Sequence, residues 1–485
     1  MQPRRARLSA AESDIESPVD GQKERAIRFR SLAPGFARLY GADKARWVNV
    51  LRLHSYVIDE SLTVVLPSDT PQQTVARIRL GGEGAIVSRE GLTLPQHFKD
   101  HPEFVHLIPW AQLFGEYFEA RGLTATPSDA GRIAEQVLKS VGGLSRAALF
   151  AHRETLETLD KMAKSVRQFS DGTTEQYPDR AMPVKLWQDL IARRNGQKRW
   201  LGNFALDAFV KAGVLRLGLS LQCPNCLNHN WCGLPELDEQ VVCERCLKKF
   251  DFPQGSLNFE RTPWQFRVVG SFAVPNYAGS AYGTVLALRA FSENLGGDAQ
   301  ITYSTGLDIL VGPEKKYEID FAFWHRRRHS FSSDEEPALA FGEAKSFAEE
   351  SFKTRDIERM EALGKAFPGA FLIFATMKDA LSEVEKTAIG NLALWGREVL
   401  KTGQPRNPVI VLTGAEMFSE WHIQHSWENL GGRHKEFASR GYTGFDNLWD
   451  FADLTQQLYL GLGDKWAEIR AKATVNAESN PPRPS

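Results

Sequence analysis

From about Trp264 to residue 415 the sequence alternates between short apolar segments and longer segments with apolar residues three and four positions apart. The short segments predict strands and the longer periodicity predicts helices. The predicted helices are AYGTVLALRAFSENLGG, TRDIERMEALGKAF and the segment from Leu381 to Val399, and the predicted strands are ITYSTGLDILVG, YEIDFAFW, ALAFGEAKSF, AFLIFAT and VIVLTG. The order helix, three strands, helix, strand, helix, strand predicts an α/β domain.

The length of 485 residues is enough for two to four domains. A net charge of -1 gives no global basic field, so any nucleic-acid contact must use local basic patches. No apolar run approaches the roughly 18 residues that span a bilayer. The first 26 residues also lack the apolar centre of a signal peptide. We therefore expect a cytoplasmic protein with no membrane partner.

All five cysteines lie between positions 223 and 246. Four of them form two C-x-x-C pairs separated by sixteen residues, namely Cys223 with Cys226 and Cys243 with Cys246. In a reducing compartment this spacing is typical of a structural Zn²⁺ site, because four thiolates leave no position for water. We interpret Cys232 and His229 as bystanders. The segment around these cysteines, a predicted zinc ribbon, could contact nucleic acid, bind a protein partner or only stabilise a small subdomain.

The rest of the chain predicts a multi-domain protein that is α+β overall. The segment SDAGRIAEQVLKSVGG predicts a helix capped by Ser128, and alternating leucines from Leu215 to Leu221 predict a strand after further helices. Such helices fit a winged helix-turn-helix or a small helical bundle. The expected segments are a disordered 1–26, a mixed region 27–122 with strand-like runs LTVVLP and ARIRL, a helical region 123–221, a zinc ribbon 222–263, the α/β domain 264–415, a helical extension 416–473 and a disordered tail 474–485.

The predicted strand ALAFGEAKSF contains the tripeptide Glu343-Ala344-Lys345, which fits the pattern (D/E)-x-K. With 60 acidic residues in the chain, about three matches are expected by chance. A second match, Glu314-Lys315-Lys316, lies in a predicted turn. The tripeptide alone is therefore weak evidence for a catalytic site, and the residues around it must show whether the match has a function.

Residues two apart in a strand share a face, so Glu343 and Lys345 are expected to point the same way. In YEIDFAFW the alternation places Glu318 and Asp320 together on one face. The expected apolar face of that strand is Tyr317, Ile319, Phe321 and Phe323. If the two strands are neighbours, Asp320, Glu343 and Lys345 converge.

Two carboxylates and the Ala344 carbonyl could hold Mg²⁺ or Mn²⁺, because hard cations take oxygen ligands. The metal would lower the pKa of a bound water, and Lys345 would orient that water or stabilise negative charge. The alternative is a surface ion pair between Glu343 and Lys345 at the ends of core strands. The apolar neighbours favour the functional interpretation, because unpaired charges are costly in interior strands.

The order αβββαβ, Asp320 in the second strand and Glu343-Ala344-Lys345 at the end of the third resemble the PD-(D/E)XK nuclease superfamily, which has the restriction-endonuclease-like fold. The resemblance covers about residues 270–415. It implies that Asp320 and Glu343 bind the metal and that Lys345 is catalytic, although Ile319 replaces the Pro of the family pattern. Further candidate metal ligands are Glu293, Glu318 and Asp308.

Two basic clusters could contact phosphates. One follows the strand of Asp320 and the other lies on the next predicted helix; together they contain Arg326, Arg327, Arg328, Arg355 and Arg359. The first cluster could equally be a solvated loop whose charge is compensated by the SSDEE that follows. His422, His425 and His434 suggest a metal site, but no cysteine accompanies them, and we interpret His422 and His425 as ordinary surface or packing residues.

These patterns together predict a metal-dependent endonuclease, and the resemblance implies that its substrate is DNA. We expect it to be a subunit of a bacterial anti-phage defence or restriction system. No P-loop or dinucleotide fingerprint is present, so a partner protein must supply any ATPase or targeting function. The alternative is a non-catalytic subunit that binds nucleic acid or assembles with a partner through the zinc ribbon and the helical region. The sequence does not specify an oligomeric state.

Overall fold

The computed structural model describes nineteen segments of the chain. They are residues 25–29, 46–51, 86–88, 91–96, 103–107, 110–119, 121–163, 166–168, 174–176, 181–197, 205–252, 264–295, 299–311, 315–327, 337–347, 351–400, 405–439, 445 and 447–464. The runs LTVVLP and ARIRL, Arg328 and the tail 474–485 lie outside them. The first strand begins at Arg25, so the expected 1–26 segment overlaps it by two residues.

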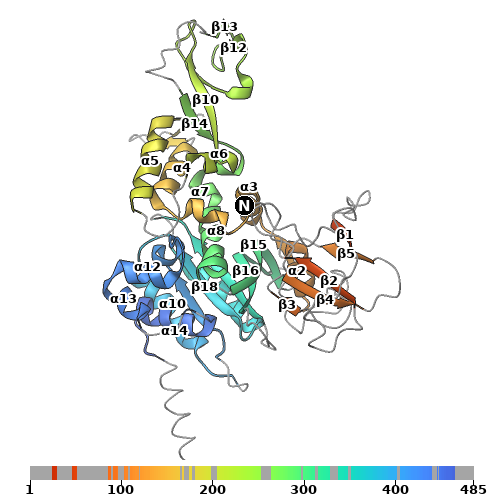
Figure 1. Cartoon of the computed structure of the whole chain (residues 1–485). Coiled ribbons are helices and arrows are strands. Elements are labelled where there is room, and N and C mark those ends of the chain that lie inside the picture. The colour runs from red at the N-terminus through yellow and green to blue at the C-terminus, as the bar shows by residue number, and fades with distance from the viewer. Residues whose placement is uncertain are drawn as a thin grey trace, which may run out of the picture. The chain divides into compact units, whose positions relative to one another are not determined.

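The described residues form two compact units (Figure 1). Unit 1 contains those of 1–132 and 283–485, and unit 2 contains those of 133–282. The boundaries fall within helices α3 (Asp129–Val141) and α8 (Ala281–Arg289). Both units mix helices and sheets, so the chain is α+β as expected. No helix in the described segments is long and apolar enough to cross a membrane.

Unit 1 is built on a six-stranded sheet with the order β19-β18-β17-β16-β15-β6. Neighbouring strands from β6 to β17 are antiparallel, whereas β17, β18 and β19 run parallel. Strands β18 and β19 are apolar except for Thr376 and are fully buried, as expected for strands covered on both faces. The strands are β6 (Thr124–Pro127), β15 (Ala299–Val311), β16 (Lys315–Arg327), β17 (Ala338–Lys345), β18 (Phe371–Thr376) and β19 (Val409–Leu412).

Helices cover both faces of this sheet. One face forms a core with α2 (Trp110–Glu119), α9 (Thr354–Ala366) and α10 (Glu383–Gly396), in which Phe114 stacks on Trp324 with ring centroids 4.1 Å apart. On the other face, Phe291 of η8 (Ala290–Asn294) packs against Phe323. The elements from α8 to β19 thus occur in the predicted order. The remaining elements of unit 1 are β1 (Arg25–Phe29), β2 (Arg46–Leu51), β3 (Ile86–Ser88), β4 (Gly91–Gln96), β5 (Glu103–Leu107), α11 (Gly414–Met417), α12 (Ile423–Leu430), α13 (Gly432–Ala438) and α14 (Leu448–Leu460).

The alternation of side chains along β16 changes phase at Asp320, which the sequence does not predict. The core that contains Tyr317 and Ile319 continues with Ala322 and Trp324 instead of Phe321 and Phe323. Those two phenylalanines stack on each other, and Phe323 packs on Phe291 of the opposite face. The expected apolar face of four residues is therefore wrong, and Glu318 and Asp320 do not follow a simple two-residue repeat.

A glycine in the neighbouring strand accompanies this change of phase. The pairing of β15 with β16 is interrupted where Gly306 stands opposite Asp320, and Gly306 has a φ of +38°. A Cβ atom on Gly306 would lie 2.4 Å from Ser128 Oγ and 2.6 Å from Gly131 Cα, so only glycine fits. Ser128 caps α3 as predicted, because its Oγ accepts the N–H of Gly131 at 3.0 Å. The chain thus brings a helix start against the position where Asp320 leaves the regular ladder.

Unit 2 combines helices with a four-stranded antiparallel sheet of order β11-β10-β14-β9. Buried Trp187 and Phe209 pack together between the helices, with ring centroids 5.6 Å apart. The helices therefore pack with a sheet and do not form a bundle of their own. The elements are η4 (Arg146–Phe150), α4 (Arg153–Ala163), β7 (Val166–Gln168), β8 (Thr174–Gln176), β9 (Met182–Pro183), α5 (Val184–Gln197), α6 (Leu206–Lys211), β10 (Leu215–Gln222), β11 (His229–Gly233), η5 (Leu234–Glu236), β12 (Gln240–Val242), β13 (Lys249–Asp251), β14 (Trp264–Val268), η7 (Gly270–Ala273) and α7 (Pro275–Gly279).

Two glycines beside the end of β17 give a matched stability test. A Cβ on Gly342 would lie 1.9 Å from the Phe321 ring, so Gly342→Ala should destabilise the protein by about 1–3 kcal/mol through overpacking. A Cβ on Gly283 in α8 would meet Ala344 Cβ at an ordinary 3.5 Å, so Gly283→Ala should stabilise by roughly 0.5–1 kcal/mol. Denaturant unfolding measures both. Equal effects of the two substitutions would contradict the packing described at the end of β17.

Candidate functional site

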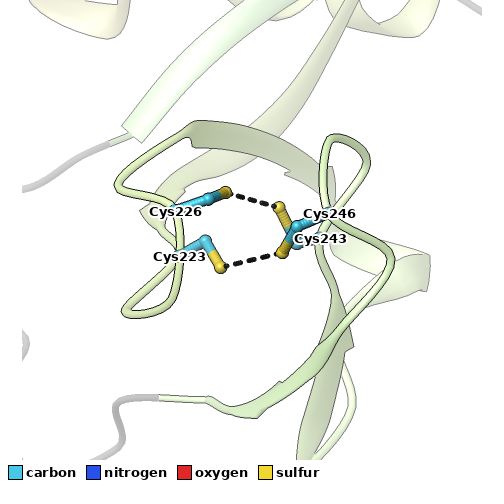
Figure 2. Close-up of side chains that lie close together, drawn as sticks. All are labelled: Cys223, Cys226, Cys243 and Cys246. Carbon is cyan, nitrogen blue, oxygen red and sulfur yellow. Dashed lines mark hydrogen bonds between the residues drawn. The ribbon is translucent and has the colours of Figure 1, made fainter.

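The four predicted cysteines come together at the ends of two hairpins in unit 2 (Figure 2). Cys223 and Cys226 lie in the turn between β10 and β11, and Cys243 and Cys246 lie in the turn between β12 and β13. Their sulfur atoms all lie within 4.8 Å of one another. Across the site, the Sγ atoms are 3.7 Å apart for Cys223 and Cys246 and 3.5 Å apart for Cys226 and Cys243.

The two turns have the same backbone geometry. In the first, the Leu227 N–H donates to the Cys223 carbonyl at 2.9 Å, and in the second the Leu247 N–H donates to the Cys243 carbonyl at 2.9 Å. Leu227 and Leu247 have φ values of +60° and +56°, in the left-handed region that side chains rarely adopt. Each C-x-x-C-Leu sequence is therefore folded into a matching turn that directs two thiols to one point.

The two hairpins are held together by a small core and one buried amide. The core contains Leu221, Val241 and Phe250 with the cysteines, and Cys232 is part of it. The Asn230 side chain is 1% exposed, and its Oδ1 accepts the Glu244 N–H from the second hairpin at 2.9 Å. Sequence reasoning missed Asn230, because an asparagine between two cysteine pairs carries no signal of burial.

The donor set fits zinc. Backbone N–H groups of Cys246 and Arg245 donate to the Cys243 sulfur and lower the pKa of that thiol to about 6, whereas burial and the neighbouring cysteines raise the pKa of Cys226 to about 11. The Cys243 thiol is therefore the one that most readily takes the thiolate form that metals bind. Four sulfurs of this arrangement satisfy a tetrahedral Zn²⁺ and leave no open position. Within the described residues, Cys232 and His229 do not belong to this group, as expected. Cys223, Cys226, Cys243 and Cys246 would hold the ion, which would supply the link between the two hairpins.

The second site lies in unit 1, where β16 and β17 stop pairing. The last paired residues are Phe321 and Gly342, so Asp320 and Glu343 occupy the next positions. At these positions the Asp320 side chain replaces a backbone hydrogen bond between the two strands, because its Oδ2 accepts the Ala344 N–H at 2.6 Å. The change of phase in β16 and the end of pairing thus position Asp320 beside Glu343.

Glu343 and Lys345 join two residues of α9 in a charged network. Lys345 Nζ donates to Glu343 Oε1 at 2.7 Å, and Arg359 Nη2 donates to Glu343 Oε2 at 2.5 Å. Asp356, which is 1% exposed, lies 3.2 Å from Arg359 Nη2 and 3.4 Å from Lys345 Nζ. Asp356 also accepts the Lys353 N–H at 3.0 Å and so fixes the first turn of α9.

Burial and mutual repulsion shape the protonation of this group. Burial raises the pKa of Asp320 well above its usual range, and the neighbouring charge of Glu343 raises it further. Burial also raises the pKa of Glu343, although Lys345 and Arg359 oppose this effect. Burial alone would lower the pKa of Lys345, but the charge and hydrogen bond of Glu343, with Asp320 and Asp356, raise it. Lys345 is therefore a cation at neutral pH and not a general base.

The structure brings together Asp320, Glu343 and Lys345, but it places other candidates elsewhere. Asp308 forms an ion pair with Lys316 at 2.9 Å and stands opposite exposed Glu318. The charges that act most strongly on Asp320 come instead from Glu343, Lys345 and Arg359. The side chains of Glu293, Arg326 and Arg327 lie outside the described residues.

The two arginines of α9 differ from each other. Arg355 is 76% exposed, as a phosphate contact requires, whereas the Arg359 side chain is 18% exposed and held by Glu343 and Asp356. Arg359 is thus part of the carboxylate network and not a free surface cation. The sequence could have indicated Asp356, because it lies three residues from Arg359 at the start of a predicted helix.

Asp320 and Glu343 have some, but not all, of the features expected of a binding site for a hard cation. Asp320 Oδ1 makes no hydrogen bond to any described residue. The charges of Asp320 and Glu343 repel each other, so a bound cation would stabilise both carboxylates. Both oxygens of Glu343, however, are already engaged by Lys345 and Arg359. Asp320 and Glu343, with the Ala344 carbonyl, would hold Mg²⁺ or Mn²⁺ only if one of these cations moves away from Glu343.

The histidines of the C-terminal part take ordinary packing positions. The rings of His422 and His425 lie 6.0 Å apart, and His434 Nε2 lies 3.1 Å from Tyr459 OH. In the described part of the chain they form no metal-binding group with cysteine or carboxylate side chains.

Comparison with known proteins gives no family. No family model matches the chain, and no curated protein matches it. A solved structure, the crystal structure of protein VC1899 from Vibrio cholerae, is 11% identical, with a TM-score of 0.26 over 68% of this chain. The chain covers 64% of the length of that structure. A similarity this distant assigns neither fold nor function.

Metal analysis of the purified protein should find one zinc per chain. Cys243→Ser should lose the metal and lower the unfolding temperature, because the two hairpins share only a small core. Cys232→Ser is the matched control, since Cys232 is buried in the same core but lies outside the sulfur group. Loss of zinc from the Cys232→Ser protein, or its retention after Cys243→Ser, would contradict the assignment.

Proposed function

We propose that the protein is a metal-dependent nuclease that hydrolyses phosphodiester bonds in DNA. The observation that carries the proposal is the convergence of Asp320, Glu343 and Lys345 where β16 and β17 stop pairing. Buried carboxylates with raised pKa values beside a charged lysine are costly to a fold and are concentrated at functional sites. The element order from α8 to β19 supports the further proposal of a restriction-endonuclease-like core of the PD-(D/E)XK type.

Each residue has a role that its surroundings support. Asp320 and Glu343 would bind Mg²⁺ or Mn²⁺, which supplies charge neutralisation at the phosphate and activates water. Lys345 stays protonated and stabilises negative charge that develops on the phosphate. Asp356 holds both Lys345 and Arg359, so it positions the lysine and provides Arg359 with a second carboxylate partner. Exposed Arg355 lies on the same helix and can contact the DNA backbone.

The zinc site serves this activity indirectly. Its four thiolates stabilise the two hairpins of unit 2, and it takes no part in hydrolysis. A partner protein would supply any ATPase or targeting function, as in a bacterial defence or restriction system. This biological setting follows from the proposed activity and from the sequence, in which no P-loop is present.

One observation favours a second candidate, a non-catalytic subunit that binds nucleic acid or assembles with a partner. Both oxygens of Glu343 are neutralised by Lys345 and Arg359, so the network is an internally paired ion cluster. Such a cluster could fix α9 to the sheet with no chemistry. Under this alternative the zinc ribbon and the helices of unit 2 carry the function.

A cleavage assay separates the two candidates. The purified protein is incubated with circular and linear DNA and Mg²⁺ or Mn²⁺, alone and with candidate partner proteins. Asp320→Ala and Lys345→Ala should each lower the cleavage rate by at least about 100-fold, because the first removes a proposed metal ligand and the second removes the charge proposed to stabilise the reacting phosphate.

Lys365→Ala is the matched control for this assay. Lys365 is an exposed cation of α9 that pairs with Glu361, so its loss removes the same charge without touching the site. Cleavage that persists unchanged in the Asp320→Ala and Lys345→Ala proteins would refute the catalytic assignment. Absence of cleavage by the wild type with every substrate and partner would support the non-catalytic subunit.

A further inference from the structure

The charged network between β17 and α9 contains more carboxyl groups than cations. Its carboxyl groups belong to Asp320, Glu343 and Asp356, and its cations are Lys345 and Arg359. Asp320 forms no ion pair with a described residue, although the charge of Glu343 acts on it. When all five groups are charged, the network lacks one positive charge, and the carboxylate without a direct cation is Asp320.

Both oxygens of Glu343 are engaged by cations, and the two cations reach it in different ways. Lys345 lies two residues further along β17, on the same face as Glu343, so its ammonium group stays beside that carboxylate. Arg359 reaches Glu343 from α9, and its Nη2 also lies 3.2 Å from Asp356 Oδ1 on its own helix. Arg359 can therefore leave Glu343 without losing a carboxylate partner.

The guanidinium group of Arg359 is incompletely hydrogen-bonded in this position. Its Nη2 donates to both Glu343 and Asp356, whereas its Nε is buried and donates to no described residue. A buried donor without an acceptor costs free energy. A turn of the guanidinium group towards Asp356 would allow Nε and Nη2 to bind that carboxylate together, which is the two-point contact that arginine favours. Arg359 thus gains a hydrogen bond by moving.

We propose that Arg359 holds Glu343 as an internal counter-ion in the metal-free protein and moves to Asp356 when Mg²⁺ or Mn²⁺ binds. The metal would take its place beside Glu343 and Asp320. The proposal concerns the regulation of this site and rests on the metal binding of the proposed function. The exchange leaves no carboxylate of the network without a cation, so the site stays folded in both states. Because Arg359 must first be displaced, it lowers the metal affinity of the site.

Isothermal titration calorimetry with Mn²⁺ alone tests the exchange without any cleavage. The full-length protein with its zinc bound is titrated, and Asp320→Ala identifies the heat that belongs to this site. Arg359→Ala should lower the Kd for Mn²⁺ by at least about tenfold, because no cation then competes for Glu343 Oε2. Lys365→Ala is the matched control, since this exposed cation of α9 pairs with Glu361, and it should leave the Kd within about twofold.

Asp356→Asn separates displacement from simple repulsion between Arg359 and the metal. Without the second carboxylate Arg359 stays on Glu343, so this variant should raise the Kd for Mn²⁺ by at least about tenfold. In the Arg359→Ala protein the same substitution should change the Kd by about twofold or less, because no arginine remains to be received.

Thermal unfolding and a second variant cover a loss of stability in Arg359→Ala. Removal of the arginine leaves Glu343 Oε2 without a cation, so the metal-free variant should unfold at a lower temperature than the wild type. Saturating Mn²⁺ should then raise its unfolding temperature by more than that of the wild type. Arg359→Gln keeps a neutral donor at this position and should also bind Mn²⁺ more tightly than the wild type.

The proposal is overturned if Arg359→Ala and Arg359→Gln bind Mn²⁺ no more tightly than the wild type, or if Asp356→Asn has equal effects with and without Arg359. Absence of Mn²⁺ binding by the wild type and every variant would overturn it together with the metal site. Failure of the nuclease proposal alone gives a different result, in which Arg359→Ala binds Mn²⁺ more tightly than the wild type but neither protein cleaves DNA.

Discussion

The structure of unit 1 depends on how it accommodates buried charge where β16 and β17 stop pairing. The Asp320 side chain replaces a backbone hydrogen bond between the two strands. Glu343 binds Lys345 of the same strand and Arg359 of α9, so the charged network joins the strand to the helix. Taking these groups from water costs free energy that ion pairs repay only in part. The change of phase in β16, the left-handed Gly306 and the buried Asp356 all serve to hold them there. A fold selected for stability alone would be better served by apolar residues at these positions.

Unit 2 depends on a different source of stability. Its cysteine-rich hairpins bury few apolar residues, so a metal held by four thiolates is the natural source of their stability.

Much of this arrangement could be predicted from periodicity and spacing. The strand and helix order from α8 to β19, the cap at Ser128 and the cysteine group all follow from local patterns. The phase change at Asp320 could not be predicted, because it depends on Gly306 and Gly131, which are distant in sequence and meet only in the fold. The same reason explains why the burial of Asn230 cannot be predicted and why Arg359, a predicted phosphate contact, is instead paired with buried carboxylates. Long-range contacts decide whether a charged residue is buried and paired.

We propose that Asp320 serves a function at a cost to stability, and the pH dependence of unfolding measures that cost. A carboxyl group with a raised pKa in the folded state contributes stability at low pH that is lost as pH rises through that pKa. Asparagine keeps the acceptor for the Ala344 N–H without the charge. Without added divalent metal, the unfolding free energy of Asp320→Asn should therefore exceed that of the wild type at pH 8, and the difference should be smaller at pH 5. A variant that is less stable than wild type at pH 8, or a difference that does not change with pH, would contradict the account.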